Sequence, residues 1–181
     1  MGSPFLDQAG NALTKPGMRH PPKRKHASKP RPAVPVRLTA EQQRLKAGSE
    51  FSKALLHLGE AEIAASRGGT PNACIHSAYY AMHHCAIAVL LMKGGVDKYG
   101  DVPGSHEHVA QHFGKAVAGL PPGIAELGLM LGRARSDRTD ADYGLGFSAS
   151  DADAFATTVV ARTFVDACQQ FWKLAVTARS D

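Results

Sequence analysis

The sequence has few cysteines, no long apolar run and almost no strand-like alternation of apolar and polar residues. Its cysteines are Cys74, Cys85 and Cys168, and no two of them form a CxxC pair. This spacing favours buried, reduced thiols in a cytoplasmic protein. The longest apolar run, residues 85–92, is much shorter than the ~20 residues that cross a bilayer, so no membrane association is expected. No signal peptide is expected either, because no apolar stretch follows the first charged residues.

Positive charge is concentrated at the start of the chain. Residues 1–37 contain eight Lys or Arg residues against Asp7 alone, a net charge of +7, and seven of the eleven prolines. The remaining residues contain thirteen Lys or Arg against fifteen Asp or Glu, a net charge of −2. A proline-rich segment without hydrophobic periodicity buries too little surface to offset the entropy of ordering. We therefore predict a disordered basic tail over residues 1–37 and a single domain over residues 38–178.

The predicted domain consists of helices. Apolar residues recur at three-to-four spacing, and Thr39, Thr70 and Ser105 stand where helix caps are expected. The predicted class is an all-α, antiparallel up-down bundle of about five helices without a sheet. The second helix is apolar on most sides and is expected at the centre of the bundle. The helices are expected near residues 40–67, 71–92, 106–119, 123–143 and 149–178.

The fifth helix is predicted from a capping box and an apolar face. Ser148 and Asp151 have the spacing of a capping box, so the helix is expected to begin after Ser148. It is expected to continue to near Ala178. The side chains expected on its apolar face are Phe155, Val159, Phe164, Ala167, Phe171 and Leu174.

Histidines and tyrosines gather in two of these helices. His108 and His112 have metal-ligand spacing, but the glutamate of the HExxH motif is missing, so no metal site or other cofactor is predicted. His83 and His84 are expected to be hydrogen-bonded core groups. Tyr80 and His84 are four residues apart and therefore share one helix face. They belong either to the core or to a site at its edge.

The segment "RSDRTDADYG" offers a second candidate site. Arg135 and Arg138 are three residues apart, and Asp142 follows Arg138 by four, so the three side chains share a helix face. One interpretation is an exposed ion pair of little energetic value. The other is a phosphate site, because guanidinium groups match the geometry of phosphate oxygens. Spacing alone leaves both open.

Three segments resemble, in order, the signature regions of the HEPN family (higher eukaryotes and prokaryotes nucleotide-binding domain). They are "SAYYAMHHCAIAVLLMKG", "SHEHVAQHFGKAV" and "LGRARSDRTDADYG". The match spans about residues 42–175 and is strongest to small stand-alone prokaryotic members whose helix ends in Arg-x-x-Ala-Asp-Tyr. The resemblance implies a helical bundle that forms a homodimer. It also implies a minimal nucleotidyltransferase as partner in a toxin–antitoxin pair.

The resemblance bears on catalysis as well. Active members of the family are metal-independent endoribonucleases in which a histidine follows an arginine by four to six residues. Here Tyr143 stands where that histidine is expected after Arg138, and a phenol with a pKa near 10 is a poor base at neutral pH. One possibility is that His84 or His106, which match recurrent positions of this branch, replaces the missing base. The other is that the domain only binds, with Tyr143 as a hydrogen-bonding group or a nucleotide-modification acceptor.

Three functions follow from these observations. The first is a nucleotide- or RNA-binding module that acts with a nucleotidyltransferase. The second is a ribonuclease toxin with a degenerate motif, and the third is a structural dimer without a ligand. The predicted catalytic residues are Arg138, Tyr143 and His84, and the predicted binding residues are Arg135, Asp142, His106 and Tyr80.

Overall fold

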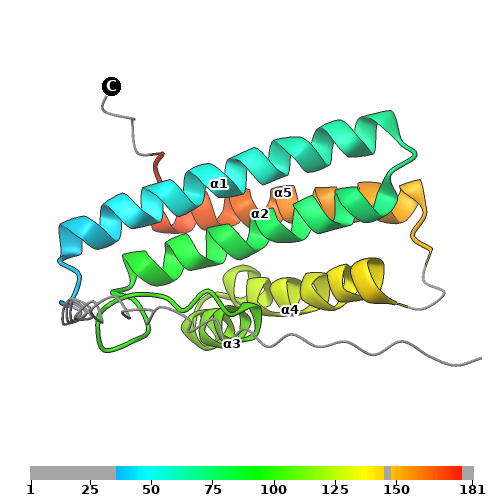
Figure 1. Cartoon of the computed structure of the whole chain (residues 1–181). Helices are drawn as coiled ribbons and strands as arrows, with labels where there is room; N and C mark the ends of the chain where they lie inside the picture. Colours follow the sequence, from blue (N-terminus) through cyan, green and yellow to red (C-terminus); the bar gives the residue numbers. More distant parts are fainter. Residues whose placement is uncertain (1–35, 145–147, 177–181) are drawn as a thin grey trace, which may run out of the picture. The chain divides into compact units, whose positions relative to one another are not determined.

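The computed structural model describes residues 36–144 and 148–176 of the chain, and this part contains five α-helices and no strand (Figure 1). This confirms the predicted all-α fold. Almost all of the predicted tail lies outside the described residues, so its prediction stays open. The helices are α1 (Ala40–Arg67), α2 (Pro71–Met92), α3 (His106–Val117), α4 (Pro122–Tyr143) and α5 (Asp151–Trp172).

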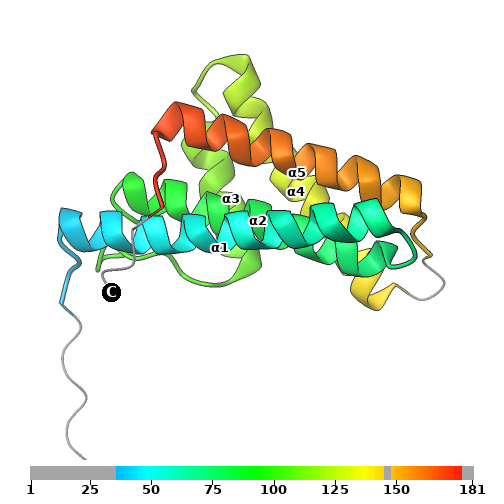
Figure 2. The same cartoon turned by 90° about the horizontal axis from the view of Figure 1, so that it is seen from above.

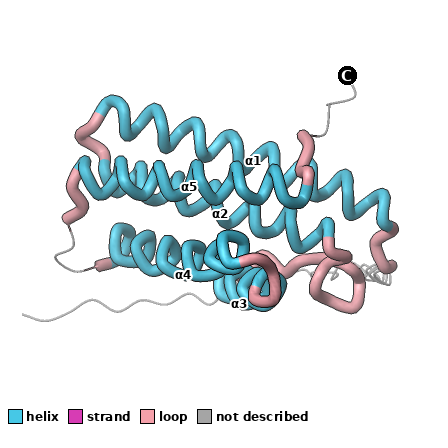
Figure 3. Tube along the Cα trace, turned by 180° about the vertical axis from the view of Figure 1, so that it is seen from behind, coloured by secondary structure: helices cyan, strands magenta, loops and turns pink. Residues whose placement is uncertain are grey.

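Helix α2 forms the centre of the bundle. It packs against each of the other four helices, and Figures 1 and 3 show it between α1 and α4. Among the described residues, α2 is the one helix long and apolar enough to cross a membrane, but 78% of its apolar window is buried inside the bundle. A core helix has this same composition because it contacts protein on every side. The expected central place of the second helix is therefore confirmed.

Helices α3 and α4 differ in direction from the other three. Figure 2 shows that α3 lies across α2 and that α4 runs obliquely to it, whereas α1, α2 and α5 run along the bundle. Val109 and Phe113 anchor α3 in the core. Its first residue, His106, is thereby carried to the side of α2 that faces α4.

The start of α1 follows the sequence closely. The Gln42 N–H donates to the Thr39 hydroxyl at 3.2 Å, and the Gln42 side chain accepts from the Thr39 N–H at 2.8 Å. This reciprocal capping box satisfies two of the donors that a helix start leaves unpaired. Thr70 precedes α2 as predicted, and Pro71 is its first residue, but the Thr70 side chain makes no capping bond. The missing N–H of proline already removes one unpaired donor there.

The predicted start and end of the fifth helix are wrong. Ser150, not Ser148, caps α5: its hydroxyl accepts from the Asp153 N–H at 3.2 Å, and Asp153 accepts from the Ser150 N–H at 2.9 Å. Asp151 serves another purpose, because its Oδ1 accepts from the Gly69 N–H at 2.9 Å and so ties α5 to the loop before α2. The helix ends at Trp172 because the next residue, Lys173, has a φ of +52°.

The predicted apolar face of α5 is also partly wrong. Phe155, Val159 and Phe171 are exposed, whereas Phe164 is fully buried as expected. Small residues make up much of the buried face instead. The buried face of α5 consists of Ala154, Thr158, Ala161, Phe164, Val165 and Cys168. All three cysteines are free and buried, which confirms that expectation.

Candidate functional site

Helices α2, α3 and α4 bring the predicted site residues to one side of the bundle. Tyr80 and His84 come from α2, and His106 comes from the first turn of α3. The last turns of helix α4 contribute the other predicted site residues, Arg135, Arg138, Asp142 and Tyr143. Residues far apart in sequence therefore meet beside Tyr80.

Arg138 lies between two tyrosine rings. Its guanidinium carbon is 5.8 Å from the ring centroid of Tyr80 and 5.4 Å from that of Tyr143. The Arg138 side chain is 17% exposed, whereas Tyr143 is 71% exposed. Both distances allow cation–π attraction, which holds the planar group in place. Tyr143 thus contacts the arginine that it follows in sequence.

Asp142 joins Arg138 to a histidine that the sequence analysis did not single out. Its Oδ2 is 2.7 Å from Nε of Arg138, an ion-pair distance, although the N–H is not aligned for a hydrogen bond. Nδ1 of His76 lies 3.3 and 3.2 Å from the two carboxylate oxygens. The His76 and Tyr80 ring centroids are 4.6 Å apart. We call His76, Tyr80, Arg138, Asp142 and Tyr143 the Arg138 cluster.

The spacing of His76 along α2 is the sequence feature that could have indicated it as a site residue. It precedes Tyr80 by four residues and His84 by eight, so all three lie on one face of α2. The partner, Asp142, is on another helix 66 residues away. Only the packing of α2 against α4 brings the two side chains together.

Beneath this cluster lies a second group of rings. The Tyr79 hydroxyl and Nδ1 of His106 are 2.8 Å apart, and the His106 ring stacks on His83 with centroids 4.4 Å apart. The Tyr80 ring meets His106 edge-on at 5.4 Å. Tyr79 is fully buried, and its hydroxyl finds its partner in His106. His83 is buried as expected, but its Nδ1 has no hydrogen-bond partner.

Burial keeps these inner rings neutral. It raises the pKa of Tyr79 to about 12, against the opposing charges of Arg135 and Arg138. The pKa of His83 is lowered to about 3, mainly by burial and to a smaller extent by the neighbouring His106 and His84. The pKa of His106 is also lowered, by burial first and then by the two arginines. At neutral pH the arginines therefore supply the positive charge of this side of the bundle.

His84 is engaged with α1. Its Nδ1 lies 2.7 Å from Oε2 of Glu50, and its ring stacks on His57 at 5.5 Å. Burial tends to raise the pKa of Glu50, but hydrogen bonds from His84 and Lys53 outweigh it and hold the pKa at about 2. His84 is thus a hydrogen-bonded group as expected. No ion pair or hydrogen bond joins it to Arg138 within the described part of the chain.

Arg135 lies at the edge of this region. Its Nη2 is 3.9 Å from Oε2 of Glu107, and both side chains are exposed. At such a distance and exposure the pair contributes little to stability. Arg135 is therefore available to a ligand, and its charge reaches His106.

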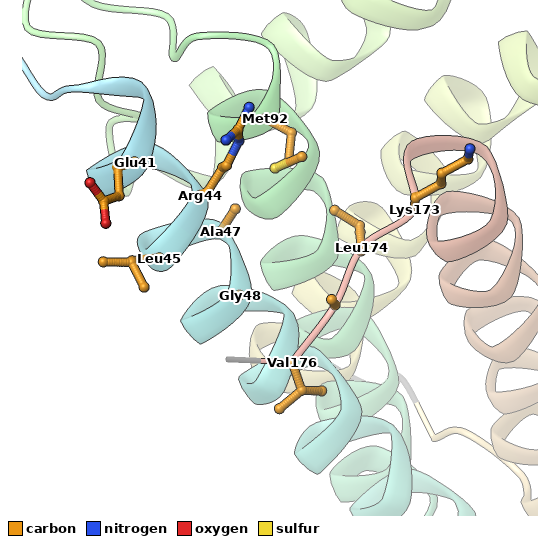
Figure 4. Close-up of a pocket in the computed structure, with 10 residues that line it drawn as sticks. Glu41, Arg44, Leu45, Ala47, Gly48, Met92, Lys173, Leu174 and Val176 are labelled. Carbon is orange, nitrogen blue, oxygen red and sulfur yellow. The ribbon is translucent and has the colours of Figure 1, made fainter. Parts of the chain in front are cut away.

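The described residues contain no group of three or more His, Cys, Asp or Glu side chains arranged to hold a metal ion. A pocket of about 370 Å³ lies elsewhere, between α1, the end of α2 and the segment after α5 (Figure 4). Its wall includes Ala47 and Leu174, with Arg44 and Lys173 among the charged residues that line it. None of the predicted site residues lines this pocket.

Comparison with known proteins does not extend the resemblance seen in the sequence. No family model matches this chain. No curated protein matches it either. Function must therefore be argued from the geometry of the side chains and from the three segments that resemble the HEPN family.

Proposed function

We propose that Arg138 binds the phosphate of RNA or of a nucleotide, as the resemblance to HEPN domains implies. The observation that carries this proposal is the guanidinium of Arg138, which two tyrosine rings hold in place. Nε of Arg138 is buried and faces Asp142, and no described residue hydrogen-bonds the terminal nitrogens of this side chain, which is 17% exposed. A fixed guanidinium with free terminal nitrogens matches two phosphate oxygens at once.

The ring of Tyr143 supports a nucleic-acid ligand over a free phosphate. It is 71% exposed and lies against Arg138, so a base next to a bound phosphate can stack on its outer face. Base–aromatic stacking is a common way to bind single-stranded RNA. Arg135 adds a second positive charge along the same helix face. We therefore favour single-stranded RNA over duplex as the ligand.

Fluorescence anisotropy with a short labelled single-stranded RNA tests the proposal. Replacing Arg138 with Ala should weaken binding by about 10- to 150-fold, since hydrogen bonds to charged groups contribute about 1.5–3 kcal/mol. Arg133→Ala is the matched control, because Arg133 is on the same helix but lines a different pocket beside Asp137 and Ala156. Equal losses in the two variants would mean that only general positive charge attracts RNA.

Cleavage of RNA is a second candidate function. Two histidine rings, His76 and His106, lie against Tyr80 within the region that holds Arg138. A histidine beside a phosphate-binding arginine is the combination that metal-independent RNA cleavage requires. If the wild type arrests growth on expression and cleaves RNA while Arg138→Ala does neither, the ribonuclease function is supported. A wild type that binds RNA without cleaving it leaves the binding function alone.

From the resemblance we also propose a homodimer and a minimal nucleotidyltransferase partner. Sedimentation equilibrium of the purified chain tests the dimer. Co-purification with a nucleotidyltransferase encoded beside it tests the partner. A dimer that binds neither RNA nor a nucleotidyltransferase would correspond to the third function, a structural dimer without a ligand.

A further inference from the structure

The His76–Asp142 pair has the arrangement of a histidine set up for proton transfer. Nδ1 of His76 is 3.3 and 3.2 Å from the two oxygens of Asp142. A carboxylate only accepts hydrogen bonds, so in the neutral imidazole the hydrogen lies on Nδ1 and the lone pair on Nε2. The His76 side chain is 42% exposed, and no described residue hydrogen-bonds Nε2. A ligand therefore has access to a free imidazole nitrogen of fixed orientation.

The pair lies directly beside the proposed phosphate site. Asp142 contacts Arg138 and His76 through the same carboxylate. The Tyr80 ring also contacts both, with its centroid 4.6 Å from that of His76 and 5.8 Å from the Arg138 guanidinium carbon. The charged or titratable groups around His76 are Asp142 and Arg138 of α4, Tyr80 of α2 and, at longer range, His106 of α3.

The other candidate bases are less suited to this role. Nδ1 of His84 bonds Glu50 of α1. Nδ1 of His106 bonds the Tyr79 hydroxyl, and its ring stacks on the buried His83. The ring of Tyr143 lies against Arg138. His84 also has an orienting carboxylate and contacts Tyr80, with ring centroids 6.1 Å apart, but its side chain is 18% exposed against 42% for His76. Among these groups, His76 is the one whose carboxylate also pairs with Arg138.

We propose that His76 is the general base of this site and that Asp142 is its positioning residue. This inference rests on the RNA-binding function proposed above. Nε2 of His76 takes the proton of a ribose 2′-hydroxyl, and the 2′ oxygen forms a bond to the adjacent phosphorus. The P–O5′ bond breaks, its electron pair leaves with the 5′ oxygen, and that oxygen takes a proton from water. The hydroxide so formed takes the proton back from His76, and the products are a 2′,3′-cyclic phosphate and a 5′-hydroxyl. Arg138 stabilises the charge on the phosphate oxygens during attack.

The test measures binding and cleavage separately on the full chain with one labelled single-stranded RNA. His76→Gln should bind RNA within about threefold of the wild type, while cleavage to the cyclic phosphate falls at least about 100-fold, the usual contribution of a general base. His108→Gln is the matched control, because His108 is an exposed histidine on α3 and should cleave like the wild type. Asp142→Asn should lower kcat more than it raises KM and should change the pH profile of kcat, which a purely structural loss would not do.

Each outcome decides between the two proposals. A wild type that binds RNA without cleaving it overturns the role of His76 and leaves the binding function intact. A wild type that neither binds nor cleaves overturns both. Cleavage that survives His76→Gln but is lost in His106→Gln assigns the base to His106 and overturns this inference.

Discussion

At the scale of single residues, Tyr143 is the position where this chain departs from the active members of the family that it resembles. Its ring lies 5.4 Å from the guanidinium carbon of Arg138. The contact needs an aromatic ring but not a hydroxyl. Tyr143→Phe should therefore leave RNA affinity nearly unchanged, whereas Tyr143→Ala should weaken it about 5- to 150-fold if a base stacks there, as stacking contributes about 1–3 kcal/mol. Anisotropy titrations of the two variants measure this difference, and an equal loss in both would assign the role to the hydroxyl.

Glu50 makes the stability of the domain sensitive to acid. Its pKa is about 2 in the folded chain against 4.5 ordinarily, so the folded state favours the carboxylate. The resulting stability is fully present above pH 4.5 and is lost as the pH falls through about 2. Glu50→Gln should therefore be less stable at pH 7 but should lose less stability between pH 5 and pH 2. Urea unfolding across this range measures the effect, with Glu60→Gln, on the exposed surface of α1, as control.

At the scale of elements, the loop between α2 and α3 sets the position of His106. Gln43 donates to the Gly100 carbonyl at 2.7 Å, and Lys46 donates to Asp101 at 2.6 Å, so α1 holds this loop in place. Within the loop, Gly95 has a φ of +75°, and a Cβ there would come 2.2 Å from the Gly100 carbonyl carbon. The backbone of this segment therefore approaches itself too closely for any side chain at residue 95.

This close approach predicts different costs at two neighbouring glycines. Gly94 has a φ of +99° but open space around a Cβ. Gly94→Ala should cost about 1–2 kcal/mol for the backbone conformation alone. Gly95→Ala should cost clearly more, because the backbone must also move apart. Thermal unfolding compares the two variants, and equal losses would show that the loop relaxes without strain.

The N-terminus of α5 provides a second test at this scale. Ser150→Ala should destabilise the domain by about 1 kcal/mol, because it removes the side-chain acceptor of the capping box. Ser148→Ala should change stability very little, since Ser148 is exposed and outside the helix. Chemical denaturation measures both. A larger loss from Ser148→Ala would restore the cap that the sequence predicted.

The sequence predicted the helices well, but it misplaced the start of α5 and part of its buried face. Thr39 and Pro71 mark helix starts through short-range chemistry that the sequence contains in full. At α5 the same Ser-x-x-Asp spacing occurs twice, at Ser148 and at Ser150. The structure uses the second of these, and the Asp151 carboxylate accepts from the distant Gly69 N–H instead. A local rule had no means of anticipating that bond.

At the scale of the whole molecule, the prediction of a disordered tail stays open, and truncation tests it. The described part of the chain begins at Val36, which is 83% exposed, and the Leu38 N–H then donates to the Tyr99 carbonyl at 2.8 Å. Removing residues 1–36 should shift the melting temperature by less than about 2 °C, since a loss of 1 kcal/mol corresponds to several degrees in a domain of this size. Removing residues 1–43 should lower it, because Thr39 and the Gln43 side chain are lost as well. A large drop with the shorter cut would show that the tail packs on the bundle.

The sequence by itself determined the helical class, the central place of α2 and the candidate value of Arg138, because helical period, apolar composition and spacing along one helix are local properties. Tertiary structure decided which groups surround that arginine. His76 and Asp142 are far apart in sequence, and Tyr80 and His106 lie on different helices, so their contacts depend on how α2, α3 and α4 pack. Packing also separated the roles of similar histidines, since burial neutralises His83 and a carboxylate engages His84. These roles depend on neighbours in space, which sequence spacing does not specify.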